Sequence, residues 1–158
     1  MVSNNPFNGG THLPDLTVIT PVYLREDAGP QDQPVFYVGS RGHHADIGGI
    51  SPGSMPPFSR HIDEEGVQIQ NFKLVDAGRL CETGMLTILG GGPHPSRNPA
   101  QNMADLRAQI AANEKGVQEL KRMVHQYGLE VVPRLTLLQR GLPSLRPAFV
   151  RALGSSYV

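Results

Sequence analysis

The chain has 158 residues, of which 39% are hydrophobic, and contains 18 Gly, 14 Pro and no net formal charge. This length is enough for one domain with a hydrophobic core, and the Gly and Pro content indicates a protein rich in turns. A net charge of zero gives no support to a nucleic-acid or acidic-membrane partner, and the longest apolar run is too short to cross a bilayer.

Cysteine usage and the first residues favour a cytoplasmic protein. The single cysteine, Cys81, cannot form an internal disulfide and fits a reducing compartment. Residues 1–15 lack the basic and apolar regions of a signal peptide, so we expect none. Residues 1–10 are expected to contain no secondary-structure element before the first motif.

Two apolar segments, residues 16–24 and 35–38, are dominated by β-branched and aromatic side chains and are bounded by Pro and Gly. They predict two strands joined by a polar loop over residues 25–34. If the strands pair antiparallel, as in a hairpin, the start of the first lies beside the end of the second.

Histidine and aspartate residues occupy the two ends that this hairpin would bring together. The candidate metal ligands are His12, Asp15, His43, His44 and Asp46. Imidazole and carboxylate suit Zn, Mn or Fe(II), and two His with one carboxylate form a recurring open ligand set. Because a proline precedes Asp15, a turn rather than a helix must bring it close to His12. The alternative is a solvated His-His loop, with Asp15 capping a turn.

The region after the second strand is rich in loops. Residues 50–60 contain several prolines and show no hydrophobic period. Glu64 and Glu65 follow, and either carboxylate can serve as a further ligand or a general base. The alternative is an exposed acidic turn. Beyond it, residues 67–74 indicate an extended segment, and residues 79–89 are compatible with helix or strand.

The clearest prediction is one long helix over residues 99–127. Asn98 is placed as its N-cap, a proline stands at the first helical position, and Gln101 is placed to complete a capping box. Apolar side chains recur in a 3-4 alternation that includes polar Asn113, and Gly128 follows as C′. Such a helix is about 43 Å long. We expect one end of it to pack on something outside this chain.

These elements predict an α+β fold: a β-hairpin or small sheet with a loop-rich site region, one long helix towards the C-terminus, and an irregular tail. Residues 133–158 contain three prolines and no acidic residue. We interpret them as a divergent, poorly ordered tail, with a basic partner-binding segment as the alternative. Residues 1–132 would then form one partial domain. The glycines at 90–92 lack the Lys-Ser/Thr of a phosphate loop, so no nucleotide site is predicted.

Several motifs of the chain resemble the hydantoinase B/5-oxoprolinase family. They are N-P-F-N-G-G-T-H-L-P-D-L-T-V-I-T-P-V at 5–22, S-R-G-H-H-A-D-I-G-G-I-S-P-G-S-M-P-P at 40–57, E-E-G-V at 64–67, F-K-L-V at 72–75 and N-M-A-D-L-R-A-Q at 102–109. The likeness runs from about residue 4 to residue 132, and the hairpin is most similar to that of eukaryotic-type 5-oxoprolinases.

The resemblance implies ATP-dependent opening of a cyclic amide, 5-oxo-L-proline to L-glutamate, in the glutathione cycle. It implies a small-molecule substrate, an oligomer, and a hydantoinase A-like domain or subunit, absent from this sequence, that handles ATP and Mg. Likeness to carboxylase relatives implies that His12, Asp15 and His43 hold a divalent metal, with His44 and Asp46 as neighbouring alternatives.

The family's B-like part is several times longer than this chain, so we expect an incomplete copy of it. Two other functions stay open at this point. One is a non-catalytic assembly or decoy module, in which the long helix binds partner subunits. The other is a hydantoinase or an acetone-carboxylase-type relative.

Overall fold

The computed structural model describes residues 1–24, 33–53 and 55–132 of the chain. Its residues fall into two units, the first made of Met1–Thr20 and Gly39–Ala111 and the second of Pro21–Val38 and Ala112–Val158. The predicted α+β class is confirmed. The predicted tail, residues 133–158, lies outside the described residues. Among the helices that are described, none combines the length and the apolar character needed to span a membrane.

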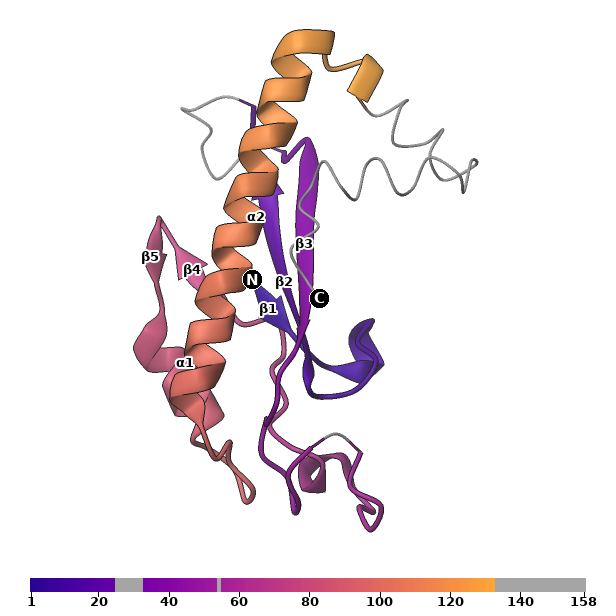
Figure 1. The fold of residues 1–158 in the computed structure, drawn as a ribbon, viewed down its shortest axis with the longest axis vertical. Helices are drawn as coiled ribbons and strands as arrows, with labels where there is room; N and C mark the ends of the chain where they lie inside the picture. Colours follow the sequence, from indigo (N-terminus) through magenta and orange to yellow (C-terminus); the bar gives the residue numbers. More distant parts are fainter. Residues whose placement is uncertain (25–32, 54, 133–158) are drawn as a thin grey trace. The chain divides into compact units, whose positions relative to one another are not determined.

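The predicted hairpin is confirmed as strands β2 (Asp15–Val22) and β3 (Phe36–His43), which lie side by side in Figure 1. In the first unit, His44 N donates to Pro14 O at 2.9 Å, and in the second, Val35 N donates to Val22 O at 2.8 Å. The start of one strand therefore meets the end of the other, which makes the pair antiparallel.

Strand β3 continues through His43, although hydrophobicity predicted its end at residue 38. The added residues are small or polar because one face of this part of the strand meets solvent and the other meets a helix. At Gly42 a Cβ atom would lie 3.2 Å from the side chain of Gln109, so only glycine fits without displacing it. Hydrophobic periodicity alone could not find this extension.

The expectation that residues 1–10 form no element is wrong. β1 (Val2–Ser3) adds to the other edge of the sheet, with Val2 opposite Val18, and the 3-10 helix η1 (Pro6–Asn8) follows it. A two-residue edge strand is held mainly by backbone hydrogen bonds and so leaves little pattern in the sequence. Val2 N and O also exchange bonds of 2.8 and 2.9 Å with Phe72, within the predicted extended segment.

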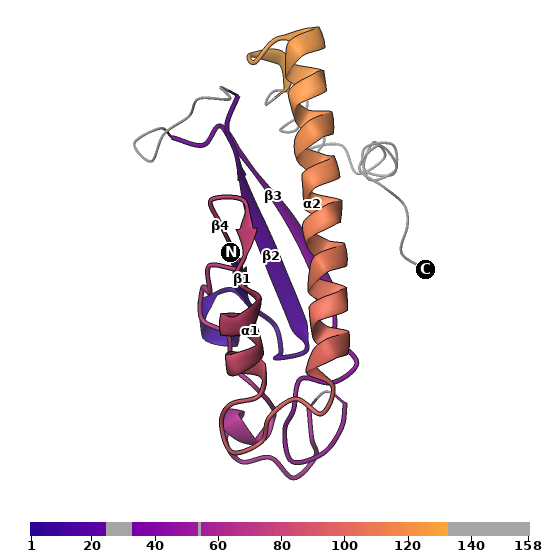
Figure 2. The same ribbon diagram turned by 90° about the vertical axis from the view of Figure 1, so that its left-hand side faces the viewer.

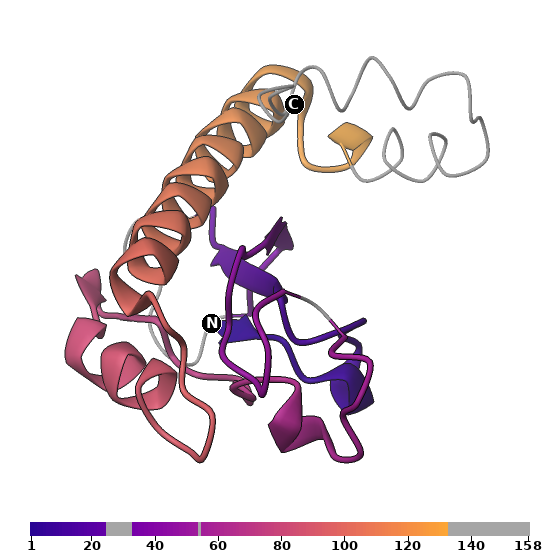
Figure 3. The same ribbon diagram turned by 60° about the horizontal axis from the view of Figure 1, so that its bottom comes forward.

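The ambiguous segment 79–89 contains both strand and helix. β4 (Val75–Asp76) pairs antiparallel with β5 (Arg79–Leu80), and α1 (Glu82–Leu89) begins two residues later. Figure 2 shows α1 near the first turns of α2 (Pro99–Tyr127), to which the ion pair between Glu82 and Arg107 connects it at 2.5 Å. Between β3 and β4, the loops and the 3-10 helix η2 (Ile62–Glu64) come forward in Figure 3.

The core of the first unit gathers side chains from every part of it. The buried apolar residues are Val2, Leu13, Leu16, Val18, Ile47, Ile69, Leu74, Met85, Leu89, Met103 and Leu106. Fully burying one such side chain contributes about 1.5–3 kcal/mol to stability. The sheet, the loops, α1 and the start of α2 are thus held around one core, which fixes the ends of β2 and β3.

Helix α2 has the predicted bounds and, in part, the predicted caps. Asn98 Oδ1 accepts from Gln101 N at 3.2 Å, and Gly128, with φ of 85°, donates its N–H to Val124 O at 2.8 Å. The reciprocal half of the capping box is wrong. Gln101 bonds Asp105 instead, because the Ser96 hydroxyl already accepts from Asn98 N.

In the second unit, two residues of α2 meet one strand residue. Asn113 is 1% exposed and donates to Val38 O at 3.4 Å, so the polar position in the apolar stripe has a backbone partner. A Cβ atom at Gly116 would lie 3.0 Å from Val38 Cγ1. This glycine, unfavourable for helix formation, allows α2 and β3 to approach closely here.

Asn4 links three segments of the first unit and was not predicted. Its side chain is fully buried, donates to Leu13 O at 2.8 Å and Val67 O at 2.9 Å, and accepts from Ile69 N at 2.7 Å. Each bond satisfies a backbone group that no strand ladder pairs. Asn4 therefore takes the place of secondary structure between the turn before β2 and the loop before β4.

Replacing Asn4 by Ala should lower the free energy of unfolding by about 3 kcal/mol, because it leaves two buried backbone groups and one partly buried one without their side-chain partner. Urea denaturation followed by circular dichroism measures this change. Exposed Asn8→Ala is the control, expected within about 0.5 kcal/mol of the parent chain. Equal stability of the two variants would show that Asn4 does not hold these segments.

Candidate functional site

A tight turn brings His12 and Asp15 together before β2. Asp15 N donates to His12 O at 3.0 Å, closing a turn around the proline that excluded a helix. The same turn leaves His12 Nδ1 3.2 Å from Asp15 Oδ2. The predicted turn geometry is therefore present, with both side chains on one side of it.

His43 reaches the same carboxylate from the last position of β3. Its Nδ1 lies 3.0 Å from Asp15 Oδ1, and its ring centroid lies 5.1 Å from that of His12. One Asp15 oxygen is thus hydrogen-bonded to His43, and the other lies within ion-pair distance of His12. The side chain of His43 is 55% exposed and that of Asp15 is 16% exposed, so the cluster opens to solvent on the His43 side.

Thr11 orients the central carboxylate. Its hydroxyl donates to Asp15 Oδ2 at 2.5 Å. Partial burial alone would raise the pKa of Asp15, but the hydrogen bonds from Thr11 and His43 and the nearby imidazoles outweigh it and lower that pKa. Asp15 is therefore a carboxylate at neutral pH, which is the form that binds a cation.

The donor set of this cluster fits a divalent metal ion. His12, Asp15 and His43 each offer one ligand atom, and these atoms lie within 4.8 Å of one another. Two ligands on opposite sides of an ion at about 2.1 Å are about 4.2 Å apart, so small side-chain rotations suffice for coordination. Two imidazoles and one carboxylate leave further positions on the ion open.

The next pair along the hairpin is also polar. Thr17 Oγ1 accepts from Arg41 Nε at 2.9 Å, and Arg41 donates through a second nitrogen to Gly9 O at 3.4 Å. Side chains two residues apart in a strand share a face, so Thr17 and Arg41 lie on the face that carries Asp15 and His43. Buried Leu16 and Val18 point to the opposite face.

The structure places His44 away from this cluster, in a buried polar network. The residue is 2% exposed; its Nδ1 accepts from Asn102 Nδ2 at 3.0 Å, and its Nε2 lies 3.3 Å from Gln109 Oε1. Burial lowers the pKa of His44, although Gln109 and the Asp105 carboxylate act in the opposite direction. Both ring nitrogens are thus engaged by neutral amide groups inside the protein.

The two amides of α2 that hold this network, Asn102 and Gln109, are the first and last residues of the motif at 102–109, but no role was predicted for them. Asn102 also donates to Asp46 O at 2.8 Å, and Gln109 donates to Leu16 O at 2.9 Å and Ser40 O at 3.3 Å. They are seven residues apart, two helical turns, and so share one face of α2. That spacing was available in the sequence, but the strand carbonyls they meet were not.

Asp46 also lies outside the cluster, in contacts that join two loops. It accepts from Gly48 N at 3.1 Å and from the backbone and guanidinium of Arg97 at 2.8 and 2.7 Å. Burial alone would raise the pKa of Asp46, but the hydrogen bonds from Arg97 and Gly48 outweigh it and lower that pKa. Gly48, which donates to Asp46, has φ of 93°, and a Cβ atom there would lie 2.2 Å from His94 O, so this turn requires glycine.

The candidate bases lie at η2. Glu64 Oε2 accepts from Arg60 N at 2.7 Å, and Glu65 Oε1 accepts from the Ser59 hydroxyl at 3.3 Å. Within the described residues, neither carboxylate joins the group formed by His12 and the other two cluster residues.

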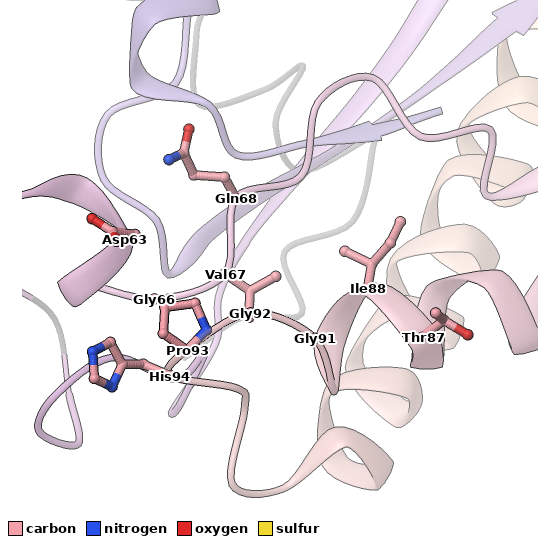
Figure 4. Close-up of a pocket in the computed structure, with 10 residues that line it drawn as sticks. All are labelled: Asp63, Gly66, Val67, Gln68, Thr87, Ile88, Gly91, Gly92, Pro93 and His94. Carbon is pink, nitrogen blue, oxygen red and sulfur yellow. The ribbon is translucent and has the colours of Figure 1, made fainter.

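A separate pocket of about 380 Å³ lies in the first unit, between the loop after η2 and the chain that leaves α1 (Figure 4). Its lining residues are Asp63, Gly66, Val67, Gln68, Thr87, Ile88, Gly91, Gly92, Pro93 and His94. Figure 4 shows apolar Val67 and Ile88 between the polar side chains. None of the three cluster residues lines it, so the pocket and the cluster are different features.

Comparison with known proteins agrees with the motifs. The family model described as hydantoinase B/oxoprolinase matches residues 1–137. A 5-oxoprolinase of Dictyostelium discoideum is 51% identical over 132 residues, which cover 84% of this chain and 10% of that protein. The 5-oxoprolinase 1 of Arabidopsis thaliana is 48% identical over 143 residues, with 84% and 11% covered. The chain spans about a tenth of the length of these curated relatives. No solved structure matches.

Asp46→Asn should destabilise the chain by about 1–3 kcal/mol at pH 7, because it weakens charge-assisted bonds to Arg97. The pKa of Asp46 is lower in the folded chain than its ordinary value of 3.8, so this stabilisation is complete above that value and is lost as the pH falls through the lowered pKa. The difference between the two proteins should therefore shrink towards pH 3. Urea denaturation between pH 7 and pH 3 measures it.

Exposed Asp76→Asn is the matched control, since it breaks only the surface ion pair with Lys73. A pH-independent difference between Asp46→Asn and the parent chain would contradict the account of the Asp46 carboxylate.

Proposed function

Because this chain belongs to the hydantoinase B/oxoprolinase family, we propose that it forms part of the hydantoinase B-like portion of a 5-oxoprolinase. The proposed reaction is ATP-dependent hydrolysis of the cyclic amide 5-oxo-L-proline to L-glutamate, within the glutathione cycle. The single observation that supports it best is the convergence of His12, Asp15 and His43 on one face of the hairpin.

These three residues would hold the divalent ion, which is Zn, Mn or Fe in this proposal. When bound, such an ion supplies a Lewis acid for the lactam carbonyl or for a water molecule. Asp15 Oδ1 is hydrogen-bonded to His43, Asp15 Oδ2 lies 3.2 Å from His12 Nδ1, and Thr11 donates to the same carboxylate, so the three donor groups are already gathered around Asp15. The open side of the cluster, at His43, is where a small substrate would enter.

The remaining parts of the reaction are assigned to other groups. Glu64 or Glu65 is the proposed general base; each first has to leave its present hydrogen bond in the loop around η2. ATP and Mg are assigned to a hydantoinase A-like domain or subunit, in an oligomeric assembly. A cytoplasmic setting completes the proposal, and the single cysteine fits its reducing conditions.

A second function, an assembly module that binds a partner chain without turnover, is favoured by exposed apolar side chains before β2 and between β3 and η2. Phe58 is 83% exposed, Phe7 is 79% exposed and Met55 is 66% exposed. Large aromatic side chains are enriched at protein interfaces. An assembly module does not require a metal, so metal binding separates the two functions.

The double substitution His12→Ala with His43→Ala should abolish Zn²⁺ or Mn²⁺ uptake, because it removes two of three ligands. Removing even an outer partner of a ligand commonly costs about 10- to 100-fold in metal affinity, so a larger loss is expected. Equilibrium dialysis measures the stoichiometry, and circular dichroism checks that the variant folds. His125→Ala, an exposed histidine of the second unit, is the control. An unchanged metal stoichiometry in the double variant would contradict the proposed metal site.

A further inference from the structure

Arg41 belongs to the cross-strand pair next to the cluster, on the same face of the hairpin. The contacts pair Asp15 with His43 and Thr17 with Arg41, so the two pairs are successive on that face. Two residues of a strand advance by about 6.8 Å. At the backbone, the two pairs are therefore about the length of one small molecule apart.

The guanidinium is fixed by the protein without being neutralised by it. Nε bonds Thr17, one further nitrogen bonds Gly9 O weakly, and no carboxylate pairs with Arg41 within the described residues. Since Arg has five N–H donors and two are used here, three stay available. The other side chains that form ion pairs with carboxylates on this face are histidines, His12 and His43.

We propose that Arg41 binds the carboxylate of the substrate and makes the site specific for cyclic amides that carry one. The proposal rests on the proposed function, which it deepens. A guanidinium offers parallel N–H donors that match the two oxygens of a carboxylate. Thr17 and Gly9 hold the side chain before the ligand arrives, which reduces the ordering cost of binding.

The chemistry of 5-oxo-L-proline agrees with this spacing. Its lactam oxygen and its carboxylate are attached to the two ring carbons that flank the nitrogen. With the carbonyl at the cluster of His12, Asp15 and His43, a ligand aligned with the strands would place its carboxylate towards Arg41. A lactam without the carboxylate loses this second point of attachment and leaves a cation without its partner.

The test compares three ligands on the full chain loaded with Zn²⁺: 5-oxo-L-proline, its neutral amide and 2-pyrrolidinone. Isothermal titration gives each affinity, and dialysis gives the Zn²⁺ content. We expect 5-oxo-L-proline to bind about 10- to 100-fold more tightly than either neutral lactam, since charge-assisted hydrogen bonds change binding affinity by about this factor. Arg41→Gln should abolish the preference with unchanged Zn²⁺ content. Arg41→Lys should keep part of this preference, because lysine retains the positive charge but lacks the parallel N–H donors of a guanidinium.

Arg79→Gln is the matched control, an exposed arginine at β5, and should leave the preference intact. A preference that survives Arg41→Gln, or a Zn²⁺-loaded parent chain that binds all three ligands equally or not at all, overturns the role of Arg41 while the metal site stands. A parent chain that binds neither Zn²⁺ nor any lactam overturns the proposed function and this inference with it.

Discussion

The antiparallel register of β2 and β3 is the constraint on which the candidate site depends. In the first unit it is fixed where His44 N bonds Pro14 O. It sets Asp15 against His43 and Thr17 against Arg41. Because side chains alternate between the faces of a strand, a slip by one residue would turn these polar groups into the core and Leu16 out to solvent. The same strand register thus buries the apolar face and brings the polar side chains together on the other face.

What holds this register is largely polar and buried. Gln109 donates to carbonyls of both strands, Leu16 O and Ser40 O, and meets the ring of His44. Asn4 ties the turn before β2 to the loop before β4. Such groups are costly unless every partner is present, and among the described residues no buried side-chain nitrogen or oxygen lacks one. The network therefore specifies one arrangement of the strand ends as well as stabilising it.

The sequence predicted the parts of this arrangement that depend on local patterns. The hairpin, the long helix with its Asn98 cap, and the neighbourhood of His12, Asp15 and His43 followed from apolar periods, turn residues and strand ends. The sequence-based prediction did not separate these three residues from His44 and Asp46, which the structure places in other contacts. That separation depends on partners from distant segments, such as Asn102 and Arg97. β1 and the bonds of Asn4 escaped prediction for the same reason.

The most direct measurement of the central claim is imidazole ¹⁵N NMR during a titration of the chain with Zn²⁺. The account predicts that ring nitrogens of His12 and His43 shift together, with completion at one equivalent, while the other four histidines stay unchanged. His44 is the sharpest internal reference, because it adjoins His43 in sequence but lies in the buried network. Equal, weak shifts at all six histidines, or a site that forms elsewhere, would contradict the claim that the hairpin alone assembles a metal centre.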